Sequence, residues 1–254
     1  MSDPFGVKAA ILDTEELLRR ELDLDPVSFA PELARAEGEL RGNPIVIETR
    51  MYVGPQIRFA RFATITCEGD VCFGIGNALC LSRPEVCLPI LGADLVALSA
   101  DAAMIAVDLS PVVPAGGARD AQLKPLAEAR ASHPALPSGG QLPSFCASWF
   151  SPFALFTRIE PSARSAAFAA YSDFSRAFVA IARRAQVDSP SMSPEEVNAA
   201  QVSYLADHRN DDKGLRMLAR LFGADWSARY IATVLFPEKL DWPSGRAAAL
   251  HDVT

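Results

Sequence analysis

Asp94 is the acidic residue whose sequence surroundings most suggest chemistry. It interrupts the apolar segment 88–111, LPILGADLVALSADAAMIAVDLSP, at a point flanked by Leu91 and Val96 and far from any turn signal. Burying an ionised carboxylate costs several kcal/mol unless it is paired or hydrogen-bonded, and its pKa usually rises in response. We therefore expect Asp94 to be a buried acid in a strand and a candidate proton donor.

The two other acids of this segment favour structural roles. Asp is common at turns because its side chain binds its own backbone. Asp101 is predicted to lie in a hairpin turn near residues 99–102, and Asp108 to accept a bond that orders the turn at Ser110 and Pro111. A similar structural role stays open for Asp94.

A second group of reactive side chains, HRNDDK at residues 208–213, precedes a predicted helix at 215–222. It could line a site, or it could be a solvated helix start whose acids interact with the positive end of the helix dipole. The residues alone leave both interpretations open.

The common catalytic motifs are absent. The chain has no GxSxG, Walker loop or HExxH, and the glycines of FGIGN at 73–77 lie inside a strand pattern rather than before a helix. Its five cysteines lack CxxC spacing and it has only three histidines, so neither a disulfide framework nor a metal site is indicated. The features left to support chemistry are carboxylates and an apolar pocket.

Composition limits the class of protein. Half of the 254 residues are apolar and no low-complexity linker divides them, which favours a single domain over 1–254. A net charge of -7 argues against nucleic acid as a partner.

The start of the chain reads as an acidic amphipathic helix rather than a signal peptide, so we expect a cytoplasmic protein. Segment 86–115 is apolar, but each Asp would cost about 2.5 to 3.5 kcal/mol at mid-bilayer, so no membrane span is expected.

Short β-type runs fill the first half of the chain, at 45–52, 57–67, 71–81, 88–98 and 102–109. The turns between them are short, which suits antiparallel hairpins. Helices are predicted at the N-terminus, near 120–131, at 162–186, after Ser193 and at 215–222. The runs at 88 and 102 are apolar on both faces, so helices should cover both sides of the sheet. We expect an α/β fold, a three-layer α/β/α sandwich with a central antiparallel sheet.

Several blocks, in order, resemble the ferredoxin-dependent bilin reductase family. They are IETR with PQIR at 47–58, LPILGADLVAL followed by DLSP, LPSFCASWFSPFALF, and NDDKGLRMLARLFGADWSARYIATVLF. The resemblance implies reduction of biliverdin IXα with single electrons from a reduced 2Fe–2S ferredoxin, through radical intermediates and with no bound flavin or metal. It also implies that the tetrapyrrole lies between the sheet and the C-terminal helices; we expect a monomer.

Residue by residue, the resemblance assigns roles. Asp94 falls on the central sheet aspartate, a proton donor to the bilin, and Asp212 on the aspartate of the C-terminal loop, a second proton source. Lys213 is a predicted contact for the substrate, with Arg216 beside it. Asn77 stands where phycocyanobilin-forming members carry a histidine, and Ala63, a predicted substrate contact, stands where they carry a glutamate.

These two departures point to a product. Alanine cannot transfer a proton, so the usual route to reduction of the D-ring vinyl group is missing, whereas Asn77 can orient a group without ionising. The pattern resembles members that make phycoerythrobilin, by four-electron reduction at the C15–C16 bridge and then the A-ring. Alternatives are a two-electron reductase that stops at 15,16-dihydrobiliverdin, a phycocyanobilin- or phytochromobilin-forming reductase, and a non-catalytic bilin carrier.

Ferredoxins are acidic, so a basic docking face is expected on an otherwise acidic chain. Arg183, Arg184 and Arg220 are the predicted ferredoxin contacts. We expect them to gather near the pocket mouth with the basic residues of 209–216, while Arg58 and Arg61 lie on the sheet side.

Overall fold

A central antiparallel sheet carries the fold. The computed structural model describes residues 6–67, 73–97, 99, 101–137, 147–185, 191–210 and 212–240, without the side chains of 212 and 213. Five consecutive strands form a meander in which each pairs with the next. They are β3 (Asn43–Val53), β4 (Ile57–Cys67), β5 (Gly74–Ser82), β6 (Ile90–Ala97) and β7 (Ala103–Ser110). The five strands predicted from the sequence are thereby confirmed.

Three strands that the apolar pattern did not predict extend this sheet at its edges. β1 (Asp25–Pro26) and β2 (Arg35–Leu40) both pair with β3, and β8 (Leu155–Ile159) pairs with β7. β2 has the sequence RAEGEL and has no buried residue. An edge strand of this kind lacks the apolar alternation by which strands are recognised.

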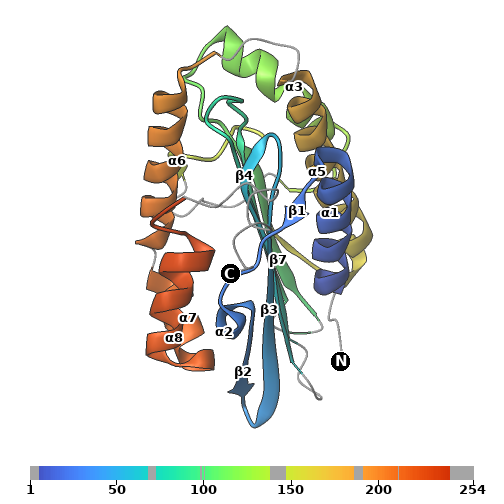
Figure 1. Ribbon diagram of the computed structural model, residues 1–254. Coiled ribbons are helices and arrows are strands. Elements are labelled where there is room, and N and C mark those ends of the chain that lie inside the picture. Colours follow the sequence, from blue (N-terminus) through green and yellow to red (C-terminus); the bar gives the residue numbers. More distant parts are fainter. Residues whose placement is uncertain are drawn as a thin grey trace, which may run out of the picture.

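One layer of helices covers the first face of the sheet: α1 (Val7–Leu22), α3 (Gly117–Ala131) and α5 (Arg164–Ala185), the last preceded by the short 3-10 helix η2 (Pro161–Ala163). Figure 1 shows α1 and α5 on the same side of the strands. The aromatic stripe of α5 is core, because Phe174 and Phe178 are fully buried. Gly76 lets α1 approach β5, since a Cβ there would meet Ile11 Cγ1 at 2.4 Å.

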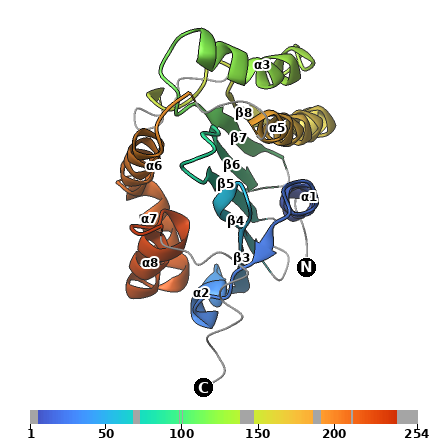
Figure 2. The ribbon, with the colours of Figure 1, turned by 45° about the horizontal axis from the view of Figure 1, so that its top comes forward.

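The second layer covers the opposite face, as the turned view in Figure 2 also shows. It consists of α6 (Pro194–Arg209), α7 (Asp212–Phe222), α8 (Ala224–Tyr230) and the π-helix η3 (Ile231–Leu235); the short α2 (Pro31–Ala34) lies beside β3. The predicted start of α6 is confirmed by a capping box between Ser193 and Glu196. Gly223, at φ +91, ends α7 and allows α8 to follow at once.

The expected α/β/α sandwich is therefore present, with one hydrophobic core on each side of the sheet. Within the described ranges, no helix is both long enough and apolar enough to cross a membrane. The apolar segment that raised this possibility forms strands β6 and β7 instead.

Candidate functional site

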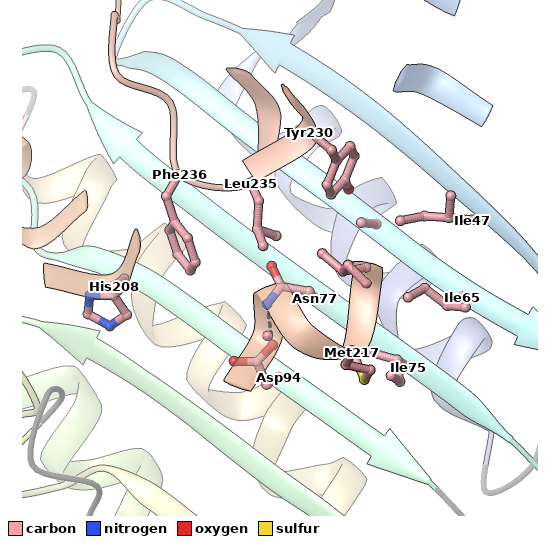
Figure 3. Close-up of a pocket in the computed structure, with 13 residues that line it drawn as sticks. Ile47, Ile65, Ile75, Asn77, Asp94, His208, Met217, Tyr230, Leu235 and Phe236 are labelled. Atoms are coloured by element: carbon pink, nitrogen blue, oxygen red, sulfur yellow. Dashed lines mark hydrogen bonds between the residues drawn. The ribbon is translucent and has the colours of Figure 1, made fainter. Parts of the chain in front are cut away.

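A cavity of about 170 Å³ lies between the sheet and the second helix layer. Its floor comes from β3 to β6 and its walls from α6, α7, α8 and η3 (Figure 3). The lining residues are Ile47, Ala63, Ile65, Ile75, Asn77, Asp94, His208, Gly214, Met217, Leu218, Tyr230, Leu235 and Phe236. Most of them are apolar, so a few polar groups would determine how a ligand is oriented.

Three of the predicted site residues form one row across the floor. Ala63 on β4 is opposite Asn77 on β5, and Asn77 is opposite Asp94 on β6. Because adjacent strands lie about 4.8 Å apart, these side chains are direct neighbours on one face. The Asn77 amide Nδ2 donates a hydrogen bond to the Asp94 carboxylate, drawn as a dashed line in Figure 3. The structure thus brings together residues that are distant in sequence.

Asp94 differs from its prediction in one respect, because its side chain is exposed rather than buried. The apolar neighbours Ala93 and Leu95 belong to the core on the opposite face of the sheet. On its own face Asp94 is flanked along the strand by Gly92 and Val96, both partly exposed. The expectation of a desolvated carboxylate was therefore wrong. An apolar run in a strand does not indicate on which face of the sheet an acidic side chain within it lies.

Asp108 is the buried acid of this region. Its carboxylate, fully buried, accepts bonds from the Ser151 backbone N–H at 2.6 Å, from Ser151 Oγ at 2.5 Å and from Ser110 Oγ at 3.2 Å. Burial raises the pKa of Asp108 to about 6, although the bonds from Ser151 act in the opposite direction. The predicted contact with Ser110 is confirmed, and the main contact, with Ser151, joins β7 to the segment before β8.

An aromatic wall borders the cavity next to Asp94. The His208 ring stacks on Tyr204, with centroids 3.9 Å apart, and its Nδ1 lies 2.8 Å from the Tyr204 carbonyl oxygen. Phe236 tilts against His208 at 5.5 Å and its carbonyl accepts a 2.6 Å bond from Arg209. This contact holds the residue that follows η3, and single-turn π-helical segments are frequent at functional sites.

Tyr230 forms another part of the wall and is almost fully buried. Its hydroxyl is 2.8 Å from Thr49 Oγ1 on β3, and burial raises its pKa. His208 belongs to the segment 208–213 that the sequence offered as a possible site, and it lines the cavity. Sequence reasoning gave no role to Tyr230 or Phe236, because their positions depend on how α8 and η3 pack. A helix-period aromatic pattern does not distinguish a cavity wall from a core.

Two of the basic residues predicted for a docking surface are engaged within the protein. Arg61 is fully buried on the cavity side of the sheet, so its assignment to an exposed basic face was wrong. Phe62, the next residue on β4, lies on the other face of the sheet and belongs to the core there. Arg58 donates a 2.8 Å bond to Asn198 on α6.

The other predicted docking residues do not gather at one place. Arg183 and Arg184 are exposed at the C-terminal end of α5, on the face of the sheet opposite the cavity, and Arg183 pairs with Glu21 of α1. Arg216 and Arg220 are exposed on α7, whose residues also line the cavity. The expectation of a single cluster was therefore wrong, because α5 and α7 belong to different layers.

The side chains of Asp212 and Lys213 lie outside the described residues, as do the placement and structure of Asp211. The backbone places 212 and 213 in the first turn of α7, just before Gly214 of the cavity wall. Their predicted roles stay predictions.

The chain matches the family model of the ferredoxin-dependent bilin reductases over residues 13–237. It therefore belongs to the ferredoxin-dependent bilin reductase family, whose members are oxidoreductases. The resemblance drawn from the sequence blocks is confirmed.

Relatives and a solved structure agree with this. The chain is 31% identical to a phycoerythrobilin:ferredoxin oxidoreductase of Gloeobacter violaceus, over 92% of this chain and 94% of that protein. It is 29% identical to a phycocyanobilin:ferredoxin oxidoreductase of Trichodesmium erythraeum, over 87% of this chain and 89% of that protein. Tomato phytochromobilin synthase, solved in complex with biliverdin, shares the fold with a TM-score of 0.75 at 22% identity, over 95% of this chain and 87% of that one.

Proposed function

We propose that this protein reduces biliverdin IXα to phycoerythrobilin with four electrons from reduced ferredoxin, first at the C15–C16 bridge and then in the A-ring. The observation that carries the proposal is the row of Ala63, Asn77 and Asp94 on the cavity floor. This row offers one carboxyl group, one amide and one methyl group to a bound pigment.

In this proposal Asp94 donates a proton to the bilin and regains it from water, which reaches its exposed side chain. The Asn77 amide orients the carboxylate through its hydrogen bond and does not itself ionise. Ala63 has no proton to give, so acid catalysis at that end of the row is absent. The chemistry of the floor thus favours bridge reduction over vinyl reduction.

The start of α7 supplies the remaining proposed contacts. Asp212 acts as the second proton source, while Lys213 and Arg216 bind the substrate. Support comes from the backbone position of these residues next to Gly214, in the helix that also contributes Met217 to the wall. Two separate acids would serve two separate reductions.

The protein itself requires no bound flavin or metal in this proposal, because the conjugated pigment holds each unpaired electron. An apolar cavity supports such radical intermediates by limiting water around them. We propose that a single cytoplasmic copy of the chain carries out the reaction and meets ferredoxin only transiently.

An anaerobic turnover assay with reduced ferredoxin, followed by extraction and chromatography of the pigment, tests the proposal. Biliverdin and 15,16-dihydrobiliverdin are supplied in separate reactions. Phycoerythrobilin from both supports a four-electron enzyme. Dihydrobiliverdin, phycocyanobilin or phytochromobilin as the end product from biliverdin, or reduction of dihydrobiliverdin alone, would refute it. Tight binding of biliverdin without any spectral change would indicate a carrier.

Replacing Asp212 separates the two reductions. In Asp212→Asn the first reduction should proceed through Asp94, while the second lacks its proton source, so 15,16-dihydrobiliverdin should accumulate. The same chromatography measures it against the wild-type time course. Complete conversion to the final product at the wild-type rate would remove Asp212 from the mechanism.

A further inference from the structure

Arg61 carries a buried charge whose hydrogen-bonding groups are only partly satisfied. Its side chain is fully buried on the cavity side of β4. Among the described residues, its Nε and Nη1 atoms have no hydrogen-bond partner and it forms no ion pair with a carboxylate. A guanidinium in this state loses its hydration with only partial compensation, which is costly and uncommon in native structures.

The position of Arg61 places this charge beside the row on the cavity floor. Arg61 is two residues from Ala63 on the same face, and it is opposite Leu79, which in turn is opposite Gly92. From Arg61 to Asp94 the backbone path crosses two strands and two residues, about 12 Å between Cα atoms, within reach of a long side chain. Its charge interacts with Tyr230 and Asp94, both of which line the cavity.

Arg61 does not itself line the cavity, so it cannot serve as a direct contact for the pigment in this arrangement. Any effect of Arg61 on the pigment must therefore be electrostatic. The described groups near Asp94 or Arg61 include Asn77 on β5, Tyr204 and His208 on α6, and Tyr230 on α8. Asp94 is the acid within this set, so while it is protonated, as the proposed donor must be, Arg61 leaves the floor with a positive charge that attracts negative charge.

We propose that Arg61 is an electrostatic positioning residue that makes reduction of the bound bilin easier. The inference rests on the proposed function. In each step that Asp94 serves, one electron leaves the ferredoxin cluster, which is oxidised, and enters the bilin. The O–H bond of the Asp94 carboxyl group breaks and its proton passes to the bilin. Asp94 becomes a carboxylate, which water later reprotonates, and the buried positive charge stabilises both the reduced pigment and this carboxylate.

A purely structural role of Arg61 leads to a different expectation for its replacement. It would contribute packing through its long stem, and its replacement would change stability alone. Replacing an unpaired buried charge by a well-packed apolar side chain of similar volume is often neutral or stabilising. Measuring both the stability of an Arg61 variant and the reduction potential of its bound bilin therefore distinguishes an electrostatic role from a structural one.

The test is an anaerobic potentiometric titration of biliverdin bound to the full chain. In Arg61→Met the one-electron reduction of the pigment should be at least tenfold less favourable than in the wild type, about 59 mV more negative for a one-electron couple. Arg61→Lys keeps the charge and should restore most of this shift. The unfolding temperature of the Met variant should equal or exceed that of the wild type. An unchanged potential in Arg61→Met would overturn the inference.

A second pair of variants keeps the test valid if Arg61→Met does not fold. Leu79→Glu places a carboxylate directly opposite Arg61 in the strand register and should neutralise it, with Leu79→Gln as the uncharged control. The Glu variant should shift the potential to more negative values than the Gln variant, and equal potentials would overturn the inference. A wild-type protein that binds no biliverdin, or cannot be reduced with it, would instead refute the proposed function.

Discussion

Asp94 and Asp108 point to the same side of neighbouring strands, yet their surroundings differ. Asp94 is exposed and accepts a hydrogen bond from the Asn77 amide, whereas Asp108 is fully buried among serine donors. Water and a ligand can reach the first and not the second. Asp94 is therefore suited to exchanging protons, and Asp108 to fixing a segment of the chain.

Replacing Asp94 by Asn should remove a proton donor and little else. Acid catalysis by a positioned side chain contributes about 10²–10⁴-fold, so single-turnover reduction of bound biliverdin should slow by that factor. Because the side chain is exposed, the free energy of unfolding should change by less than about 0.5 kcal/mol. Asp101→Asn, at an exposed turn position, is the matched control. A wild-type rate in Asp94→Asn would exclude Asp94 as the donor.

The raised pKa of Asp108 makes a prediction about pH. Its pKa moves from an ordinary value of 3.8 to about 6, so the folded state binds the proton more tightly than the unfolded state. The stabilisation from this group is complete below about pH 4 and is lost as the pH rises through 6, a change of roughly 3 kcal/mol.

The variant Asp108→Asn isolates this effect, because the asparagine has no proton to lose. The difference in unfolding free energy between wild type and Asp108→Asn, measured by urea titration, should fall as pH rises from 4 to 7. A difference that stays constant over this range would show that Asp108 keeps an ordinary pKa.

At the scale of elements, the contact between β6 and α6 supports the aromatic wall. Gly92 leaves room for the end of the Tyr204 side chain, since a Cβ there would lie 2.9 Å from the Tyr204 hydroxyl. Tyr204 in turn carries the stacked ring of His208. The absence of a side chain at Gly92 therefore helps to set where the Tyr204 ring lies against the sheet.

Gly92→Ala should force Tyr204 to move and should destabilise the protein by about 1–3 kcal/mol, the usual effect of overpacking. Gly117→Ala, in α3, has open space around it and should leave stability unchanged or slightly higher. Thermal unfolding of the two variants provides the comparison. Equal unfolding temperatures would mean that α6 adjusts without loss.

The strands and helices also show which parts of the fold could be predicted from the sequence. Strands β3 to β7 and the long helices follow from apolar periodicity and turn residues, and the resemblance located Ala63, Asn77 and Asp94. The exposure of Asp94 and the burial of Arg61 did not follow, because each depends on which face of a strand a distant helix covers. The wall formed by η3 was missed for a similar reason, since a π-helix has no simple sequence period.

At the scale of the whole molecule, the two helix layers separate the basic side chains. Arg184 is exposed beside the face opposite the cavity, and Arg220 is exposed on the layer that encloses it. Electrons must reach the cavity, so we expect ferredoxin to dock on the layer of α7. The charge on that layer should speed and orient the encounter.

Two charge reversals test this arrangement. Arg220→Glu should weaken ferredoxin binding several-fold, and the effect should shrink with added salt because exposed charges are screened. Arg184→Glu makes the same change on the other face and should leave binding unchanged. The dissociation constant for ferredoxin, measured across a salt series, decides between the faces. A larger effect from Arg184→Glu would place the docking site on the α5 side.

The row of Ala63, Asn77 and Asp94 also bears on how such enzymes diverge. It lies where β4, β5 and β6 pair without a shift in register, and its side chains border a cavity rather than filling a core. A substitution there changes the groups offered to the pigment and leaves the strand pairing intact. If the proposed roles of these residues hold, we expect that single substitutions in the row can change the colour of the product while the scaffold stays constant.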